Sequence, residues 1–141
     1  MLGIVFLLSA CNRCRPRCQN GSCVKKSCSC DVWYSGDACD KSVLNVYQGY
    51  YVGTVTTDSN QQRVGFNLSV GVEPDVMVAD SLQIQLNFTD EARFEVLSQE
   101  TNFGSRSGEG EMLIDIVSIR LDGVSGLTED ELTIEARKQG T

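Results

Sequence analysis

The sequence predicts a mainly β protein, in which a small disulfide-rich module precedes an antiparallel β-barrel or β-sandwich domain. Six of the seven cysteines lie between positions 14 and 39 of the 141 residues, which is the density of a disulfide scaffold. Residues 43–141 contain no cysteine, and apolar and polar residues alternate there in several runs. No helical periodicity of useful length occurs. We therefore expect two unlike parts, 11–41 and 43–141, after a leader of ten residues.

The composition excludes several classes of function. The chain has no histidine, which rules out Ser-His-Asp and Cys-His catalytic sites and any histidine-ligated metal. From Asn12 to Lys41, six basic residues face three acidic ones, whereas from Ser42 onward six basic residues face sixteen acidic ones. Because so acidic a body repels phosphate backbones, we expect no nucleic-acid partner.

The first ten residues are predicted to be a signal peptide. Met1 to Ala10 is an apolar run of signal-peptide length, shorter than the ~20 residues of a membrane-spanning helix. The segment Leu8-Ser9-Ala10-Cys11 resembles the bacterial lipobox, which implies cleavage before Cys11 and acylation of its sulfur. The alternative is an ordinary secretory signal, with Cys11 left as a free or intermolecular thiol. The lipobox explains why this chain has an odd cysteine, and it predicts a lipid anchor in a membrane.

The next six cysteines predict a module held together by disulfides. Their spacing is C-x3-C-x4-C-x4-C-x-C-x8-C from Cys14 to Cys39, which alone leaves the pairing open. Cys28 and Cys30 flank one residue, so in an extended segment both point to the same face and each needs a partner elsewhere in the chain. A module of under ~40 residues has too few apolar side chains for a core, and its bridges replace that core.

This module resembles the EGF-like family. The resemblance rests on Cys18-Gln19-Asn20-Gly21-Ser22-Cys23, on Cys28-Ser29-Cys30, and on Tyr34, Gly36 and Cys39 of the closing segment, in which Trp33 replaces the first glycine. It implies the pairs Cys14–Cys23, Cys18–Cys28 and Cys30–Cys39. Zinc held by Cys14, Cys18, Cys28 and Cys30 is the competing hypothesis, which an oxidising compartment disfavours. No carboxylate precedes the first cysteine of the module, so we expect no calcium there.

The module is expected to lie at a bilayer surface, because only two residues separate Cys11 from Cys14. Its basic residues would then meet anionic headgroups, the alternative being a solvated basic face without a partner. These residues are Arg13, Arg15, Arg17, Lys25 and Lys26. The order of lipobox, EGF-like module and β domain resembles small envelope lipoproteins of the Bacteroidota type. That resemblance implies the bacterial cell envelope and its outer membrane, and leaves the periplasmic or surface face open.

The body is predicted to consist of short strands joined by polar turns. Period-two alternation favours strands at 64–72, 82–88, 94–96 and 132–136, and residues 47–57 form a further tyrosine-rich strand. Residues 112–121 change phase, which indicates a bulge or a strand that changes faces. Turn residues stand at 58–60, 73–75, 89–91, 104–110 and 122–123. Such spacing is typical of an antiparallel meander.

No catalytic or metal site is predicted in the body. Glu109 with Glu111, and Glu129 with Asp130 and Glu131, occur in polar connections where solvated charge is the usual explanation. The glycine-rich stretch 104–110 lacks the lysine and helix of a phosphate-binding loop, and we interpret it as a flexible hairpin loop. Four loop acids offer calcium ligands without a recognisable spacing: Asp75, Asp80, Asp90 and Glu91.

The function expected from these features is a non-catalytic binding or adhesion module, held at the membrane by its lipid anchor and directed at a protein or glycan partner. No cofactor is expected. The alternative is a lipocalin-like carrier, with a small apolar ligand inside a barrel lined by large apolar residues such as Phe66, Phe88 and Phe94.

Overall fold

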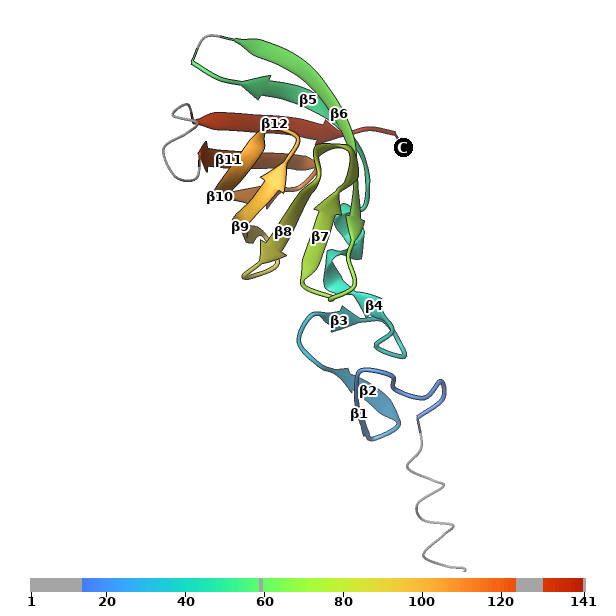
Figure 1. Cartoon of the computed structure of the whole chain (residues 1–141). Coiled ribbons are helices and arrows are strands. Elements are labelled where there is room, and N and C mark those ends of the chain that lie inside the picture. Colours follow the sequence, from blue (N-terminus) through green and yellow to red (C-terminus); the bar gives the residue numbers. More distant parts are fainter. Residues whose placement is uncertain (1–13, 59, 124–130, 141) are drawn as a thin grey trace, which may run out of the picture. The chain divides into compact units, whose positions relative to one another are not determined.

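The computed structural model describes residues 14–58, 60–123 and 131–140, and they form an almost entirely β structure (Figure 1). The chain divides into two units, one up to Val43 and the other from Leu44 onward, which we describe separately. Among the described residues, none of the helices has the length and apolar character required to cross a bilayer.

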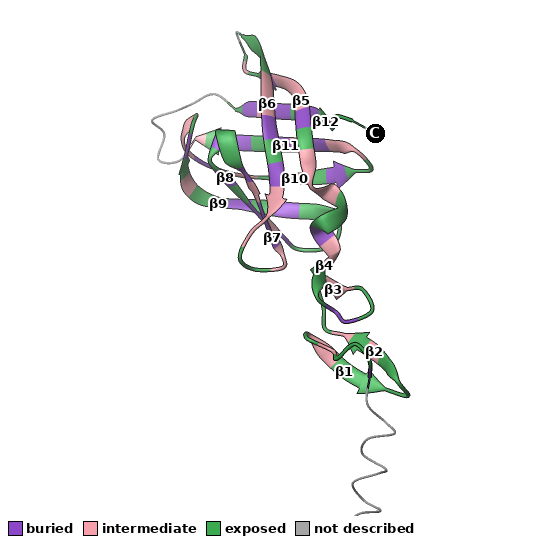
Figure 2. Ribbon diagram, turned by 90° about the vertical axis from the view of Figure 1, so that its right-hand side faces the viewer, coloured by how far each residue is buried: buried purple, intermediate pink, exposed green. Residues whose placement is uncertain are grey.

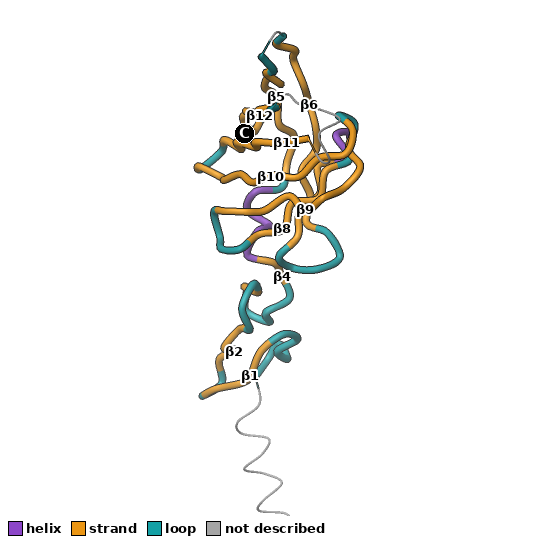
Figure 3. The backbone as a smooth tube through the Cα atoms, turned by 60° about the vertical axis from the view of Figure 1, so that its left-hand side comes forward, coloured by secondary structure: helices purple, strands orange, loops and turns teal. Residues whose placement is uncertain are grey.

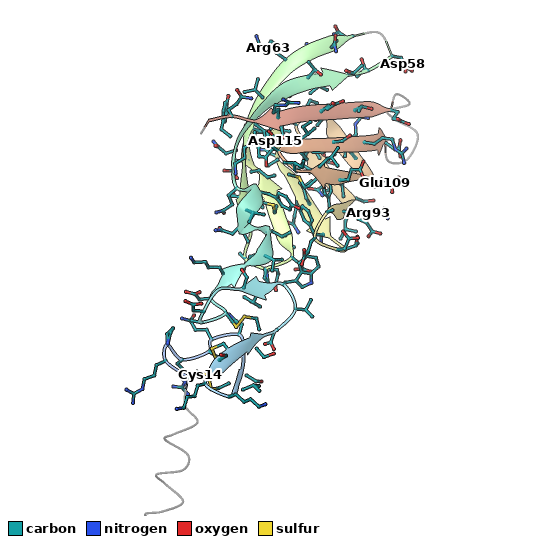
Figure 4. The ribbon with its side chains drawn as sticks, turned by 180° about the vertical axis from the view of Figure 1, so that it is seen from behind. Cys14, Asp58, Arg63, Arg93, Glu109 and Asp115 are labelled. Carbon is teal, nitrogen blue, oxygen red and sulfur yellow. A yellow bond between two sulfur atoms is a disulfide. The ribbon has the colours of Figure 1, made fainter. Side chains whose placement is uncertain are left out.

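The first unit is a small disulfide-rich module. Strands β1 (Gly21–Val24) and β2 (Ser27–Cys30) form an antiparallel hairpin, and β3 (Tyr34–Ser35) pairs with β4 (Lys41–Ser42). Three disulfides, the yellow bonds in Figure 4, join its segments: Cys14–Cys23, Cys18–Cys28 and Cys30–Cys39. This is the pairing that the resemblance implies. The two cysteines of β2 therefore do find partners elsewhere in the chain.

The second unit is a closed antiparallel barrel of eight strands. Of the two architectures that the sequence left open, barrel and sandwich, the structure has the barrel. Each strand pairs with its neighbour in the chain, and β12 closes the barrel by pairing with β5. The strands are β5 (Gly49–Thr56), β6 (Gln61–Val70), β7 (Val76–Ala79), β8 (Ile84–Phe88), β9 (Arg93–Thr101), β10 (Gly104–Leu113), β11 (Ile116–Gly123) and β12 (Leu132–Lys138).

The inward side chains fill the barrel. They alternate with less buried ones along β8, β11 and β12, and purple bands recur along the strands of the barrel in Figure 2. A cavity that held a ligand would leave accessible surface on the side chains around it. Many inward residues instead have an exposure of zero: Tyr51, Met77, Ile84, Leu86, Val117, Ile119, Leu121 and Ile134. The aromatic rings pack as two pairs, Tyr51 on Phe66 and Phe88 on Phe94, with ring centroids 5.8 Å and 5.1 Å apart.

Two short 3-10 helices lie in this unit, purple in Figure 3. The helix η1 (Val43–Tyr47) precedes β5 at what we call the near end of the barrel, and its Leu44 is fully buried. The Tyr51 hydroxyl donates to the Tyr47 carbonyl oxygen at 2.8 Å, and the Tyr47 ring stacks on Phe88. The helix η2 (Asp80–Leu82) connects β7 to β8 at the opposite, far end. Helix η1 thus covers one opening of the barrel.

The prediction of a flexible turn at 104–110 is wrong, because these residues form the first part of β10. Small residues at inward positions hide the strand's alternation. A Cβ on Gly110 would lie 2.4 Å from the Phe94 ring and 2.2 Å from the Ser118 carbonyl oxygen, and one on Gly108 would lie 1.8 Å from the Arg120 carbonyl oxygen. Glycine is required where the barrel wall and the Phe94 ring meet this closely.

Three strand predictions also need correction. The change of phase at 112–121 is a hairpin between β10 and β11 with its turn at Ile114 and Asp115, and the register shift lies earlier, between Arg106 and Gly108. The tyrosine-rich strand begins only at Gly49, since the residues before it form η1. Strand β7 (Val76–Ala79) was not predicted, because four apolar residues in a row show no alternation.

Candidate functional site

The outer face of β9, β10 and β11 carries a band of interleaved charges. Glu109 on β10 stands opposite Glu95 of β9 on one side and Arg120 of β11 on the other. Arg120 forms an ion pair with Glu109, and both side chains are exposed. Glu111, two residues further on, stands opposite Arg93. Both glutamates point outward because residues two apart in a strand share a face.

Two shallow hollows, of about 350 and 380 Å³, flank this ion pair. Both are lined by Glu109 and Arg120. The first also includes Arg93, Glu111 and Ser118, and the second includes Glu95, Leu97 and Asp122. Leu97 is one of the large apolar side chains that the barrel exposes. We call the band and its hollows the β9–β11 face. It offers donors, acceptors and one apolar contact to a polar partner, as the rims of binding surfaces do.

Among the described residues, no three of the acidic residues singled out in the sequence lie close enough together to share a metal ion. Glu109 is engaged with Arg120, and Glu131 is exposed beside β12, while Glu129 and Asp130 lie outside the described residues. In the described part of the chain, the group of potential metal ligands close enough to share an ion comprises Cys14, Cys18 and Cys28, whose sulfurs are all in disulfides.

Asp90, one of the four loop acids that offer calcium ligands without a recognisable spacing, accepts hydrogen bonds from its own turn. Its carboxylate accepts hydrogen bonds from the backbone N–H groups of Ala92 and Arg93, each at 2.8 Å. These hydrogen bonds hold the pKa of Asp90 below its usual value. The carboxylate shapes the turn between β8 and β9.

Two tyrosines at the near end have raised pKa values. Burial raises the pKa of Tyr51 to about 12, with smaller contributions from the charges of Asp115 and Tyr47. Burial, followed by the negative charges of Glu91 and Asp90, also raises the pKa of Tyr47, whose hydroxyl donates to the Glu91 carbonyl oxygen at 2.6 Å. Both hydroxyls are therefore protonated at neutral pH and act as hydrogen-bond donors within the barrel.

Arg106 is a buried cation that the sequence analysis missed. It occupies an inward position of β10 with 6% exposure. Its Nε donates to the Phe103 carbonyl oxygen at 3.1 Å, and its Nη1 approaches the Leu121 carbonyl oxygen at 3.5 Å. The side chain thus satisfies backbone groups at the far end of the barrel. An arginine beside glycines and serines gives no signal of burial in the sequence.

The basic residues of the module are exposed where the structure describes them. Arg15 and Arg17 line a hollow of about 520 Å³, and Lys25 and Lys26 form the turn between β1 and β2. Cys11 and Arg13 lie outside the described residues. The lipidation proposed at Cys11 therefore rests on the sequence alone.

Comparison of the chain with protein-family models, with curated proteins and with solved structures finds no match.

Proposed function

We propose that this chain is a lipoprotein of the bacterial envelope, anchored at the outer membrane through an acylated Cys11, whose barrel is a non-catalytic binding or adhesion module for a protein or glycan partner. The observation that carries the proposal is the filled interior of the barrel. Since the inward side chains occupy that space, the outer surface remains for recognition. On that surface, the β9–β11 face combines charged side chains with two hollows.

The proposal takes the N-terminal module to be EGF-like and to act as a spacer and interaction surface next to the anchor. The pairing of its cysteines supports this assignment. Trp33 adds a second argument. It has a φ of 76°, in the left-handed region that favours glycine, and it occupies the position where the family usually has one.

The β9–β11 face suits a partner that is polar and partly charged. Glu95 and Glu109 stand directly opposite each other, and Arg120 neutralises only one of these like charges. A cationic or hydroxyl-rich group that approached Glu95 would relieve this repulsion. The face is open and shallow, which fits a surface contact with a protein or a glycan chain better than enclosure of a small molecule.

The anchor is tested by expressing the full chain in a bacterial host fed an acyl-chain probe. The wild type should carry the label and sediment with membranes, because several acyl chains anchor a protein stably. Cys11→Ser should be unlabelled and released, whereas Asn12→Ser, the matched control at the next position, should behave as the wild type. A Cys11→Ser chain that still sediments with membranes as the wild type does would contradict the anchor.

Binding by the barrel is tested with the full chain carrying Cys11→Ser, titrated onto isolated envelopes of the host. Adding Glu95→Lys should lower the saturable affinity by about tenfold or more, the effect of losing about 1.4 kcal/mol from a charge pair. Glu73→Lys, an identical charge reversal in the loop before β7, serves as the control and should leave the affinity unchanged. Equal affinities for the two variants would argue against the β9–β11 face.

The carrier alternative is weakened by the same filled interior. It predicts that a lipid or pigment co-purifies with the full chain and appears as an added mass in a native mass spectrum. For the full chain with Cys11→Ser, which has no acyl anchor, we expect the mass of the polypeptide alone. An added mass that is lost on denaturation would favour the carrier.

A further inference from the structure

The disulfide-rich module gathers its cations into one small region. Between Cys14 and Cys30 the sequence has four basic residues and no acidic one. Arg15 and Arg17 lie in the loop between Cys14 and Cys18, and Lys25 and Lys26 lie at the tip of the β1–β2 hairpin. All four are exposed, and none forms an ion pair with another described residue. Their charges are therefore available to a ligand.

Two disulfides fix the loop and the hairpin to each other. Cys14 is bonded to Cys23 and Cys18 to Cys28, with Cα–Cα distances of 5.7 and 5.6 Å. Cys23 and Cys28 also face each other across the hairpin, two residues from either side of its lysine turn. The arginine loop is thus bonded at both of its ends to the base of the lysine turn. Little conformational entropy is lost when a ligand engages a framework already fixed in this way.

The surface between these cations is concave. The hollow of about 520 Å³ is lined by Arg15 and Arg17, and a second one of about 260 Å³ is lined by Arg15, Lys26 and also Asp37. Arg15 belongs to both hollows. Guanidinium groups bind phosphate oxygens in pairs, and ammonium groups bind them as point charges.

Lys25 and Lys26, which form the turn of the β1–β2 hairpin, have strained backbone conformations and exposed side chains. Lys25 and Lys26 have φ values of 50° and 67° in a two-residue hairpin turn, where asparagine and glycine are the preferred residues. Val24, immediately before them, is also exposed. A hairpin tip with two ammonium groups and an apolar neighbour suits the interface of a bilayer, where charges meet phosphates and apolar side chains meet acyl chains.

We propose that Arg15, Arg17, Lys25 and Lys26 form a binding surface for the phosphate groups of an anionic lipid bilayer, which we call the phosphate face. The inference rests on the proposed function, since the anchor brings the module to a membrane. The phosphate face then orients a chain that the acyl group only tethers.

The test uses the full chain with Cys11→Ser, so that binding is independent of acylation. Its partition is measured by sedimentation with vesicles of phosphatidylcholine alone and with vesicles of equal parts phosphatidylcholine and phosphatidylglycerol. We expect binding to the anionic vesicles only. Adding Lys25→Asn with Lys26→Gly should lower the partition by about thirtyfold, because each basic residue near an anionic surface contributes ~1 kcal/mol. This variant carries the pair that the turn prefers, so it keeps the fold.

The control variant Lys41→Gln with Arg63→Gln removes the same number of charges outside the phosphate face and should bind as the parent chain does. Equal binding to neutral and anionic vesicles would overturn the proposal, as would an equal loss in the control variant. Inorganic phosphate is then added at the same concentration as the lipid phosphate, at constant ionic strength. If it displaces the chain from the anionic vesicles, the ligand is a free anion and the proposal is overturned. If this test succeeds but Cys11 is not acylated in cells, the proposal of the phosphate face stands and the proposal of the anchor fails. The two proposals can therefore fail separately.

Discussion

Ile114 at the turn between β10 and β11 should be a residue whose removal stabilises the protein. Its φ is 59°, it is β-branched, and it is the first of the two residues that join Leu113 to Ile116. A β-branched side chain is strongly disfavoured in this conformation, and hairpins that place their first turn residue at positive φ prefer glycine there. Because 88% of the side chain is exposed, its truncation removes little buried apolar surface.

The expected gain follows from three contributions. Relief of the left-handed conformation contributes ~1–2 kcal/mol. The greater freedom of glycine in the unfolded chain costs ~0.5–1 kcal/mol. Burying a whole isoleucine contributes ~1.5–3 kcal/mol, so the small buried fraction of Ile114 accounts for ~0.2–0.4 kcal/mol. The net change for Ile114→Gly is a stabilisation of about 0.5 kcal/mol, or a rise of ~2–4 °C in the melting temperature of a domain of this size.

The assay is thermal unfolding of the full chain with its disulfides intact, followed by far-ultraviolet circular dichroism, which is dominated by the barrel. Trp33, the only tryptophan of the chain, lies in the module and reports separately on that unit. Leu113→Gly is the matched control. This neighbour pairs in the ladder and has a larger buried fraction, so the same change should lower the melting temperature. If both glycine variants destabilise the barrel equally, the strain argument is refuted.

Reduction of the three disulfides should change the fluorescence of Trp33 and leave the circular dichroism of the barrel unchanged. All three disulfides lie in the module, and each stabilises it by ~2–4 kcal/mol in place of an apolar core. Since the pKa of Tyr51 is raised to about 12, its neutral form stabilises the barrel fully below pH ~10, the pKa of an unfolded tyrosine, and this stability is lost as the pH rises to about 12. Urea midpoints of the wild type should fall over that window, and those of Tyr51→Phe should fall less. Arg106→Met should lower the free energy of unfolding by ~1–3 kcal/mol, since buried carbonyl groups lose their donor, and Ser107→Ala, its half-exposed neighbour, should change it little in urea titrations.

The sequence predicts a strand wherever apolar and polar side chains alternate with the two-residue repeat of the strand. Strands β6, β8 and β12 show clean alternation because their inward positions carry apolar residues such as Phe66, Leu86 and Ile134. Strand β10 escapes prediction, since its inward positions include Arg106, Gly108 and Gly110, which are determined by what lies across the barrel. A pattern along one strand contains no information about its neighbours.

The same limit applies to the candidate sites. Glu109 meets Arg120 only through the register of β10 on β11, so no spacing in the sequence indicates the β9–β11 face. The cations of the module could be named from the sequence, because they crowd a short segment. That they share one surface depends on which cysteines are bonded, and the resemblance to a family implied that pairing where spacing alone left it open.

The closing ladder of the barrel has a consequence for how the chain folds. Seven of the eight ladders join strands that follow each other in sequence, and these can form as local hairpins. The ladder between β12 and β5 joins residues such as Ala136 and Gly53, at opposite ends of the barrel's sequence. Its loop-closure entropy must be overcome before its contacts contribute, so it is expected to form last and to limit the folding rate. Until the last strand docks, β5 presents an unpaired edge. An exported chain would need protection from strand-to-strand aggregation during that interval.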